Sequence, residues 1–192
     1  MILASLKPYY YYLIGERKKT IEVRKSALKN LPQDIVFYMS KDEKSFAKIP
    51  KEFQEKYRKH FGKIGMKVVC DKVERFSVGS LRSDDIEKLA CLSYNEMICY
   101  FYKPEELDGE TTKQGFAWHI SDLKIYDKPK ELGEFYTIPE SGSDCCFGCI
   151  WNATPLDEMP CRTCKRERKY LYRPPQSYMF VEEVEEQNNN DN

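Results

Sequence analysis

Apolar and polar residues alternate in several short stretches of the chain, and this period of two predicts half-buried β-strands. In residues 18–25 (KKTIEVRK), Ile21 and Val23 alternate with the polar Glu22 and Arg24. Because successive strand residues point to opposite faces, Glu22 and Arg24 are expected to share one face of this strand. Similar patterns predict strands over residues 34–40, 66–76, 116–126 (one or two strands) and 177–184.

Helical signals lie between these strands. Pro8 suits the first turn of a helix that runs towards Gly15, and Ser93 and Glu96 have the spacing of a capping box. The four tyrosines at 9–12 lie within the first helix. They are interpreted either as core residues or as a platform on which bases stack. Helices are expected at residues 8–15, 50–61, 83–92 and 93–103.

The order of these elements favours an α+β fold. Several strands follow one another without an intervening helix, which argues against a doubly wound parallel sheet. We therefore expect a small, mostly antiparallel β-barrel with peripheral helices, and 192 residues favour one core that carries an insertion. The expected segments are a barrel over 1–138, a cysteine-rich insertion over 139–173, a final barrel strand over 174–185 and a disordered tail over 186–192.

Charge and hydropathy limit the classes of partner. The chain has 31 basic and 31 acidic residues, so a charged partner must be met by a local patch rather than by a global field. Residues 44–67 form one locally basic stretch. The chain starts without the pattern of a secretory signal, and no window approaches about 18 uninterrupted apolar residues. We therefore expect a cytoplasmic protein without a membrane partner.

The cysteines give the sharpest motif. Cys146 and Cys149 form one Cys-x-x-Cys pair, and Cys161 and Cys164 form a second pair after eleven residues. Two such pairs allow four thiolates to bind one Zn²⁺ tetrahedrally, which leaves no open position and makes the zinc structural. Cys145 is an alternative first ligand, although Cys146 restores the two-residue spacer. A set of reduced cysteines or a redox pair is the other interpretation.

The polar strand carries a resemblance to a known family. Residues 19–24, together with SLKP at 5–8, resemble the ASCH domain, a PUA-like barrel with the signature Gly-x-Lys-x-x-Glu-x-Arg. Lys19, Glu22 and Arg24 match its last three fixed positions, whereas Arg17 stands at the glycine position. Residues 67–76, 115–135 and 173–183 also resemble segments of phage and bacterial ASCH proteins. The resemblance thus covers the whole chain, with the cysteine region as an insertion.

This resemblance implies a cleft near the signature that binds RNA or a nucleotide-like ligand. Lys19 and Arg24 suit phosphate oxygens, and Trp118 offers a stacking face. The alternative for Trp118 and its neighbour His119 is a core residue beside a satisfied polar one. The basic run at 165–173, which contains tyrosines, is either a second nucleic-acid contact or a solvated surface. The candidate binding residues are Lys7, Lys19, Glu22, Arg24, Trp118 and His119.

The resemblance also raises an enzymatic alternative. Some ASCH proteins are hydrolases that deacetylate N4-acetylcytidine, and another is described as a ribonuclease. The deacetylases combine the signature lysine with a threonine three positions later and a glutamate from a later helix. Here Lys19 and Glu22 are the catalytic candidates, with Glu22 at the threonine position and Glu87 or Glu96 as a second carboxylate. Glu22 could equally form ion pairs that shape the cleft, and a protein-interaction accessory that uses the zinc loop is a third class.

Overall fold

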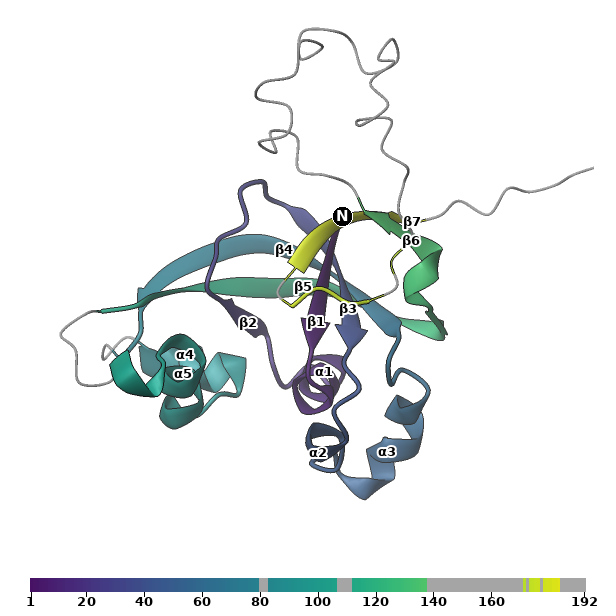
Figure 1. The fold of residues 1–192 in the computed structure, drawn as a ribbon, viewed down its shortest axis with the longest axis horizontal. Coiled ribbons are helices and arrows are strands. Elements are labelled where there is room, and N and C mark those ends of the chain that lie inside the picture. Colours follow the sequence, from purple (N-terminus) through teal and green to yellow (C-terminus); the bar gives the residue numbers. More distant parts are fainter. Residues whose placement is uncertain (80–82, 107–111, 138–170, 172, 177, 184–192) are drawn as a thin grey trace, which may run out of the picture.

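The computed structural model describes residues 1–79, 83–106, 112–137, 171, 173–176 and 178–183. These residues form one sheet of seven strands, five α-helices and two 3₁₀ helices (Figure 1). The strands are β1 (Ile2–Leu6), β2 (Ile21–Arg24), β3 (Gln33–Met39), β4 (Ile64–Ser77), β5 (Gln114–Lys130), β6 (Phe135–Thr137) and β7 (Tyr178–Glu183). The helices are α1 (Pro8–Gly15), α2 (Glu43–Phe46), α3 (Lys51–Arg58), α4 (Ser83–Ala90) and α5 (Tyr94–Phe101), with η1 (Pro104–Glu106) and η2 (Leu132–Glu134).

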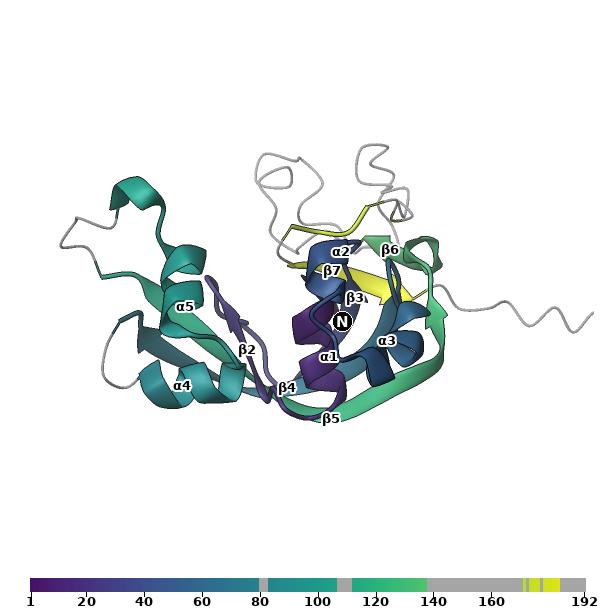
Figure 2. The same ribbon diagram turned by 90° about the horizontal axis from the view of Figure 1, so that it is seen from below.

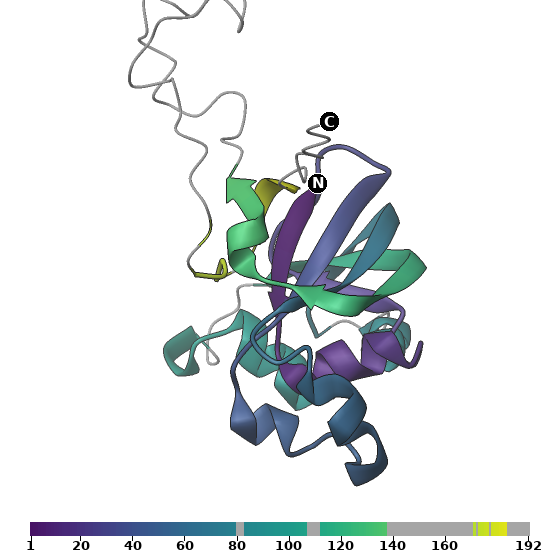
Figure 3. The ribbon, with the colours of Figure 1, turned by 90° about the vertical axis from the view of Figure 1, so that its right-hand side faces the viewer.

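The sheet is mostly antiparallel, which confirms the predicted α+β class. Its strand order is β2-β5-β4-β3-β1-β7-β6, and β1 with β3 is its parallel pair. The long strands β4 and β5 pair over most of their length. The five α-helices gather at one end of the strands, while β6 and β7 lie towards the other end (Figures 1 and 3).

The expected barrel does not close in the part of the chain that the structure describes, because β2 and β6 stand at opposite ends of the strand order. β2 is only four residues long and pairs with β5 alone. Across from β2, an Nη atom of Arg24 donates to the Ser5 carbonyl oxygen of β1 at 2.9 Å. A side chain thus links β2 to β1, which is not its neighbour in the strand order.

Three apolar clusters hold these elements in place. The largest lies inside the curved sheet and includes Tyr11, Phe37 and Trp118. A second cluster joins Ile21 and Val23 of β2 to α4 and α5, so that these two helices pack where the sheet ends. The third lies between β1, β3 and β7 and includes the buried Leu171. β2 is therefore held by apolar contacts on one face while its other face is polar.

Most expected elements are present, and their bounds shift by a few residues. The capping box at Ser93 and Glu96 forms as predicted, with the Glu96 amide donating to the Ser93 hydroxyl at 3.3 Å. The 116–126 pattern belongs to a single strand, β5, that continues to Lys130. The short helix α2 was not expected; Asp42 caps it by accepting from the Ser45 amide at 3.0 Å.

The cysteine-rich insertion and the tail fall almost wholly outside the described residues. The chain leaves the described region after β6 and re-enters it at Leu171, and β7 then pairs with both β1 and β6. Among the described helices, none is long and apolar enough to cross a membrane.

Candidate functional site

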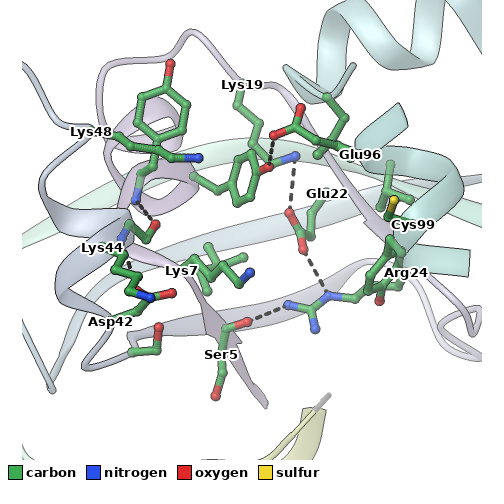
Figure 4. A pocket seen from close by; sticks show the side chains of 18 of the residues that line it. Ser5, Lys7, Lys19, Glu22, Arg24, Asp42, Lys44, Lys48, Glu96 and Cys99 are labelled. Atoms are coloured by element: carbon green, nitrogen blue, oxygen red, sulfur yellow. Dashed lines mark hydrogen bonds and ion pairs between the residues drawn. The ribbon is translucent and has the colours of Figure 1, made fainter. Parts of the chain in front are cut away.

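A cleft of about 730 Å³ opens between two groups of helices. The first group, α1 with α2, forms one side of the cleft, and α5 in the second group forms the other side (Figure 4). β2 lies between these two groups when the molecule is seen along the sheet (Figure 2). Five of the described lining residues are cationic and three are acidic, so the lining has a positive balance: Lys7, Lys19, Arg24, Lys44 and Lys48 against Glu22, Asp42 and Glu96.

The floor of the cleft is a buried ion-paired triad of Lys19, Glu22 and Arg24. One Glu22 oxygen lies 3.3 Å from Lys19 Nζ, and the other lies 3.0 Å from Arg24 Nε (Figure 4). Lys19, Glu22 and Arg24 are only 2%, 7% and 5% exposed. A buried charge is stable only when it is paired and hydrogen-bonded, so one carboxylate holds two cations in fixed positions.

The sequence of β2 explains why the triad faces the cleft. Ile21 and Val23 pack into the cluster with α4 and α5, and strand alternation turns Glu22 and Arg24 to the opposite face. Lys19 precedes the strand, and its amide donates to the Leu13 carbonyl oxygen at the end of α1 at 3.0 Å. The triad is thus positioned by the α1–β2 connection and by β2.

The surroundings of Lys19 change its ionisation. Its Nζ donates to the Ala90 carbonyl oxygen at 2.7 Å and lies 5.5 Å from the centre of the Tyr10 ring. Burial lowers the pKa of Lys19 because desolvation penalises the ammonium, and the Glu22 carboxylate opposes this shift. Lys19 is therefore easier to deprotonate than an ordinary lysine.

A hydrogen bond joins α1 on one side of the cleft to α5 on the other. The Tyr10 hydroxyl donates to a Glu96 oxygen at 3.0 Å. Burial, together with the bond to Glu96, raises the pKa of Tyr10, so the phenol stays protonated. The pKa of Glu96 is lowered, first by the Ser93 amide and also by Tyr10 and the nearby Lys48. Glu96 is thus an ionised acceptor engaged in capping α5.

The rim of the cleft carries the exposed cations Lys7, Lys44 and Lys48. Lys7 precedes α1 and extends into the middle of the cleft, while the other two follow from α2 and the turn after it (Figure 4). The Ser45 hydroxyl, which accepts from the Tyr9 amide at 3.1 Å, joins α2 to the start of α1. This contact holds the three lysines on one side of the opening.

Solved structures with the same arrangement of elements identify the fold. Two crystal structures of the ASCH protein from Zymomonas mobilis, a Tyr-to-Phe and a Ser-to-Ala variant, each match with a TM-score of 0.53 and 18% identity. Each match covers 94% of this chain, and 89% and 87% respectively of the other chain. This chain has the ASCH fold. No family model and no curated protein matches it.

The floor of the cleft brings together Lys19, Glu22 and Arg24, the three residues that resemble the ASCH signature. The two aromatic candidates, Trp118 and His119, are not among its described lining residues. Trp118 lies opposite Glu22 on β5 but is fully buried: its Nε1 donates to the Ser26 carbonyl oxygen, and its ring lies 5.7 Å from the Arg24 guanidinium. His119 points to the other face of β5, with Nε2 3.4 Å from a Glu74 oxygen. Trp118 therefore supports Arg24 from below, and His119 lies outside the cleft.

Several lining residues were not among the sequence candidates. Tyr11 and Tyr12 are buried, as the core interpretation expects, whereas Tyr9 and Tyr10 line the cleft. Tyr100 lines the α5 wall and is 41% exposed. Lys44 and Lys48 were signalled only by the locally basic stretch at 44–67. Of the two proposed second carboxylates, Glu96 reaches the cleft, and Glu87 is not among its described lining residues.

The four cysteines of the expected zinc site, Cys146, Cys149, Cys161 and Cys164, lie outside the described residues, as does Cys145. Within the described residues, no three histidine, cysteine or acidic side chains gather closely enough to hold a metal ion. The donor set is nevertheless chemically suited to zinc, because two Cys-x-x-Cys pairs supply four soft thiolates.

Proposed function

We propose that the cleft binds RNA. The observation that carries this proposal is the combination of an exposed cationic rim with a buried floor whose two cations share one carboxylate. A ligand phosphate gains most from cations that are open to solvent and held in place, which describes Lys7, Lys44 and Lys48. Tyr9 and Tyr100 add aromatic faces on which unpaired bases can stack.

The volume and the charges of the cleft agree with a ligand of this kind. A cleft of about 730 Å³ lies within the range of sites that enclose small molecules, about 300 to 1,000 Å³. One or a few nucleotides would therefore enter, while the rest of an RNA chain would cross the rim. Arg24 contributes less to phosphate binding than the rim does, because it already holds Glu22 and the Ser5 carbonyl oxygen.

Replacing the three rim lysines by alanine tests the proposal. The Lys7→Ala, Lys44→Ala, Lys48→Ala protein should bind a short single-stranded RNA at least about 10-fold more weakly in fluorescence anisotropy. The slope of log affinity against log salt should fall by about 2, since each lost phosphate contact contributes about 0.7 on single strands.

The matched control replaces three exposed lysines outside the described lining of the cleft, Lys29, Lys51 and Lys128, by alanine. This protein has the same net charge as the rim variant, so it should retain the affinity and most of the salt slope. If both proteins lose the same RNA affinity, the loss comes from the lower net charge alone, and the cleft is rejected as the binding site.

A hydrolase that acts on RNA or on a modified nucleoside is the second candidate, and the environment of Lys19 favours it. A lysine with a lowered pKa beside a carboxylate can take up a proton. The test is release of cytidine from N4-acetylcytidine, and of fragments from RNA, by the wild type and by Lys19→Met. If the wild type turns over either substrate and Lys19→Met does not, the protein is an enzyme. If the wild type binds RNA but turns over neither substrate, binding is the function that remains.

We also propose that Cys146, Cys149, Cys161 and Cys164 hold a structural Zn²⁺. The purified protein should then contain about one zinc per chain by elemental analysis, and Cys149→Ser with Cys164→Ser should lose it. Cys145→Ser against Cys146→Ser decides which of these two cysteines is a ligand. If the cysteine variants lose RNA binding while the rim variant keeps it, the interaction surface lies in the insertion and the cleft is dispensable.

A further inference from the structure

The edge of β2 that faces away from β5 offers main-chain groups to the cleft. The Ile120 amide donates to the Thr20 carbonyl oxygen at 2.9 Å, so Thr20, directly before β2, and Ile120 of β5 form a hydrogen-bonded pair of opposed residues. In such a pair, opposed residues alternate between bonded and non-bonded positions. Glu22 therefore turns its N–H and C=O towards Trp118, and Val23 turns its own away from β5.

Val23 reaches the cleft through its main chain. Its side chain packs in the cluster with α4 and α5, on the face opposite to Glu22 and Arg24, and yet Val23 is one of the residues that line the cleft. Among the described residues, no hydrogen-bond partner lies against its N–H and C=O on this side. Val23 is 4% exposed, and a buried main-chain donor and acceptor without partners are costly. A ligand that enters the cleft would supply the missing hydrogen bonds.

The chemistry of that partner follows from the geometry of a strand edge. The N–H and C=O of one extended residue point the same way and form an adjacent donor and acceptor. The Watson–Crick edge of every nucleobase likewise carries a donor next to an acceptor. A planar base can therefore pair with Val23 while its phosphate lies towards the cationic rim.

An added peptide strand fits this edge less well. Strand addition needs several consecutive residues with outward main-chain groups. Here the Thr20 amide already donates to the Leu89 carbonyl oxygen at 3.0 Å, and an Nη atom of Arg24 donates to the Ser5 carbonyl oxygen. Ile21 also turns its N–H and C=O away from β5, but of these two residues only Val23 is among the described residues that line the cleft. One donor and acceptor pair is therefore offered to the cleft, which suits one base.

We propose that Val23 pairs through its main chain with the Watson–Crick edge of one nucleobase, so that the cleft takes an unpaired nucleotide and excludes duplex RNA. This inference rests on the proposed RNA-binding function and specifies which part of the RNA enters. Since a base in a duplex already uses this edge, the selection of single strands follows from the strand geometry.

Two experiments test the pairing, and the first leaves the protein unchanged. Titration calorimetry compares AMP, GMP, CMP and UMP with their counterparts methylated at N1 of the purines or N3 of the pyrimidines. The preferred mononucleotide should bind about 10-fold more tightly than its methylated form, and ribose 5-phosphate, which lacks a base altogether, should bind no more tightly than the methylated form. Equal affinities for the preferred mononucleotide and its methylated form would overturn the proposal.

The second experiment replaces the Val23 residue by its α-hydroxy acid, which exchanges the N–H for an ester oxygen and keeps the side chain. Binding of the preferred mononucleotide should weaken about 10-fold, and binding of ribose 5-phosphate should not change. The same exchange at the exposed Lys29 should change neither affinity. An unchanged affinity in the Val23 ester would also overturn the pairing.

These outcomes separate the inference from the proposed function. If RNA binding depends on the rim lysines while methylated and unmethylated mononucleotides bind alike, the cleft binds RNA but Val23 does not read a base. If the wild type binds neither RNA nor any mononucleotide, the proposed function itself is rejected and the pairing with it.

Discussion

The cations of the floor and the cations of the rim belong to one cleft but lie in different surroundings. On the floor, Lys19 and Arg24 are buried and share the carboxylate of Glu22. On the rim, Lys7, Lys44 and Lys48 are exposed. A buried, paired cation interacts mainly with its carboxylate partner inside the protein, whereas an exposed cation can interact with a ligand. The floor should therefore determine stability and shape, and the rim should determine affinity.

Removing Glu22 should have the largest effect on stability. Glu22→Ala leaves Lys19 and Arg24 buried together without the carboxylate between them, which should lower the free energy of unfolding by about 3 kcal/mol in urea titrations. Glu43 is the control, because its ion pair with Arg58 is exposed and Glu43→Ala should cost about 1 kcal/mol at most. Similar losses in both variants would erase the distinction between floor and surface.

Lys19→Met should have the next largest effect, about 2 kcal/mol at neutral pH, because Glu22 keeps Arg24 as its partner. The loss should also depend on pH. Lys19 has a lower pKa in the folded state than in the unfolded state, so the unfolded chain holds more protons as the pH approaches the usual lysine value of about 10.5. The wild type thus gains stability over this window relative to Lys19→Met.

Urea midpoints of both proteins at pH 8, 9 and 10 provide the measurement. Comparing the two proteins cancels the ionisation of groups that they share, such as the tyrosines. A difference that stays constant or shrinks as the pH rises would show that burial does not penalise the charge of Lys19.

Tyr10→Phe should lower the free energy of unfolding by about 1 kcal/mol, because it removes the hydrogen bond from Tyr10 on α1 to Glu96 on α5. Thermal unfolding is a suitable measurement, with Tyr94→Phe at an exposed position on α5 as the control. If Tyr10→Phe is as stable as the control, the two walls of the cleft are joined by packing alone.

The rim variant that lacks Lys7, Lys44 and Lys48 should have the smallest effect, within about 0.5 kcal/mol of the wild type in the same urea titrations. Exposed side chains away from buried networks contribute little to stability. A loss as large as that of Lys19→Met would mean that the rim also holds the fold together, and it would weaken the proposal that these lysines act on a ligand.

The sequence predicts the floor of the site because its pattern is local. Strand alternation places Glu22 and Arg24 on one face, and both lie there in the structure. The same alternation argues against a joint role for Trp118 and His119, since neighbours on a strand cannot both face one cleft. Trp118 then lies beneath Arg24 because β2 pairs with β5, which no local pattern reveals.

The rim depends on contacts between distant segments, so the sequence gives only a hint of it. Lys44 and Lys48 come to the cleft through α2, a four-residue helix too short for a periodic signal, which docks on α1 through Ser45. The strand patterns do not show which strand edges pair, so the sequence does not reveal that the expected barrel stays open. At the open end of the sheet, β2 is only four residues long and α4 and α5 pack against it.

The return of the chain at Leu171 has a consequence for how this protein can change. The Leu171 amide donates to the Phe135 carbonyl oxygen at 3.2 Å, so the chain re-enters beside the strand from which it left. The intervening segment 138–170 is thus attached at two neighbouring points, and the cost of closing such a connection varies only slowly with its length. A change in the number of residues between Phe135 and Leu171 should therefore alter the free energy of folding only slightly.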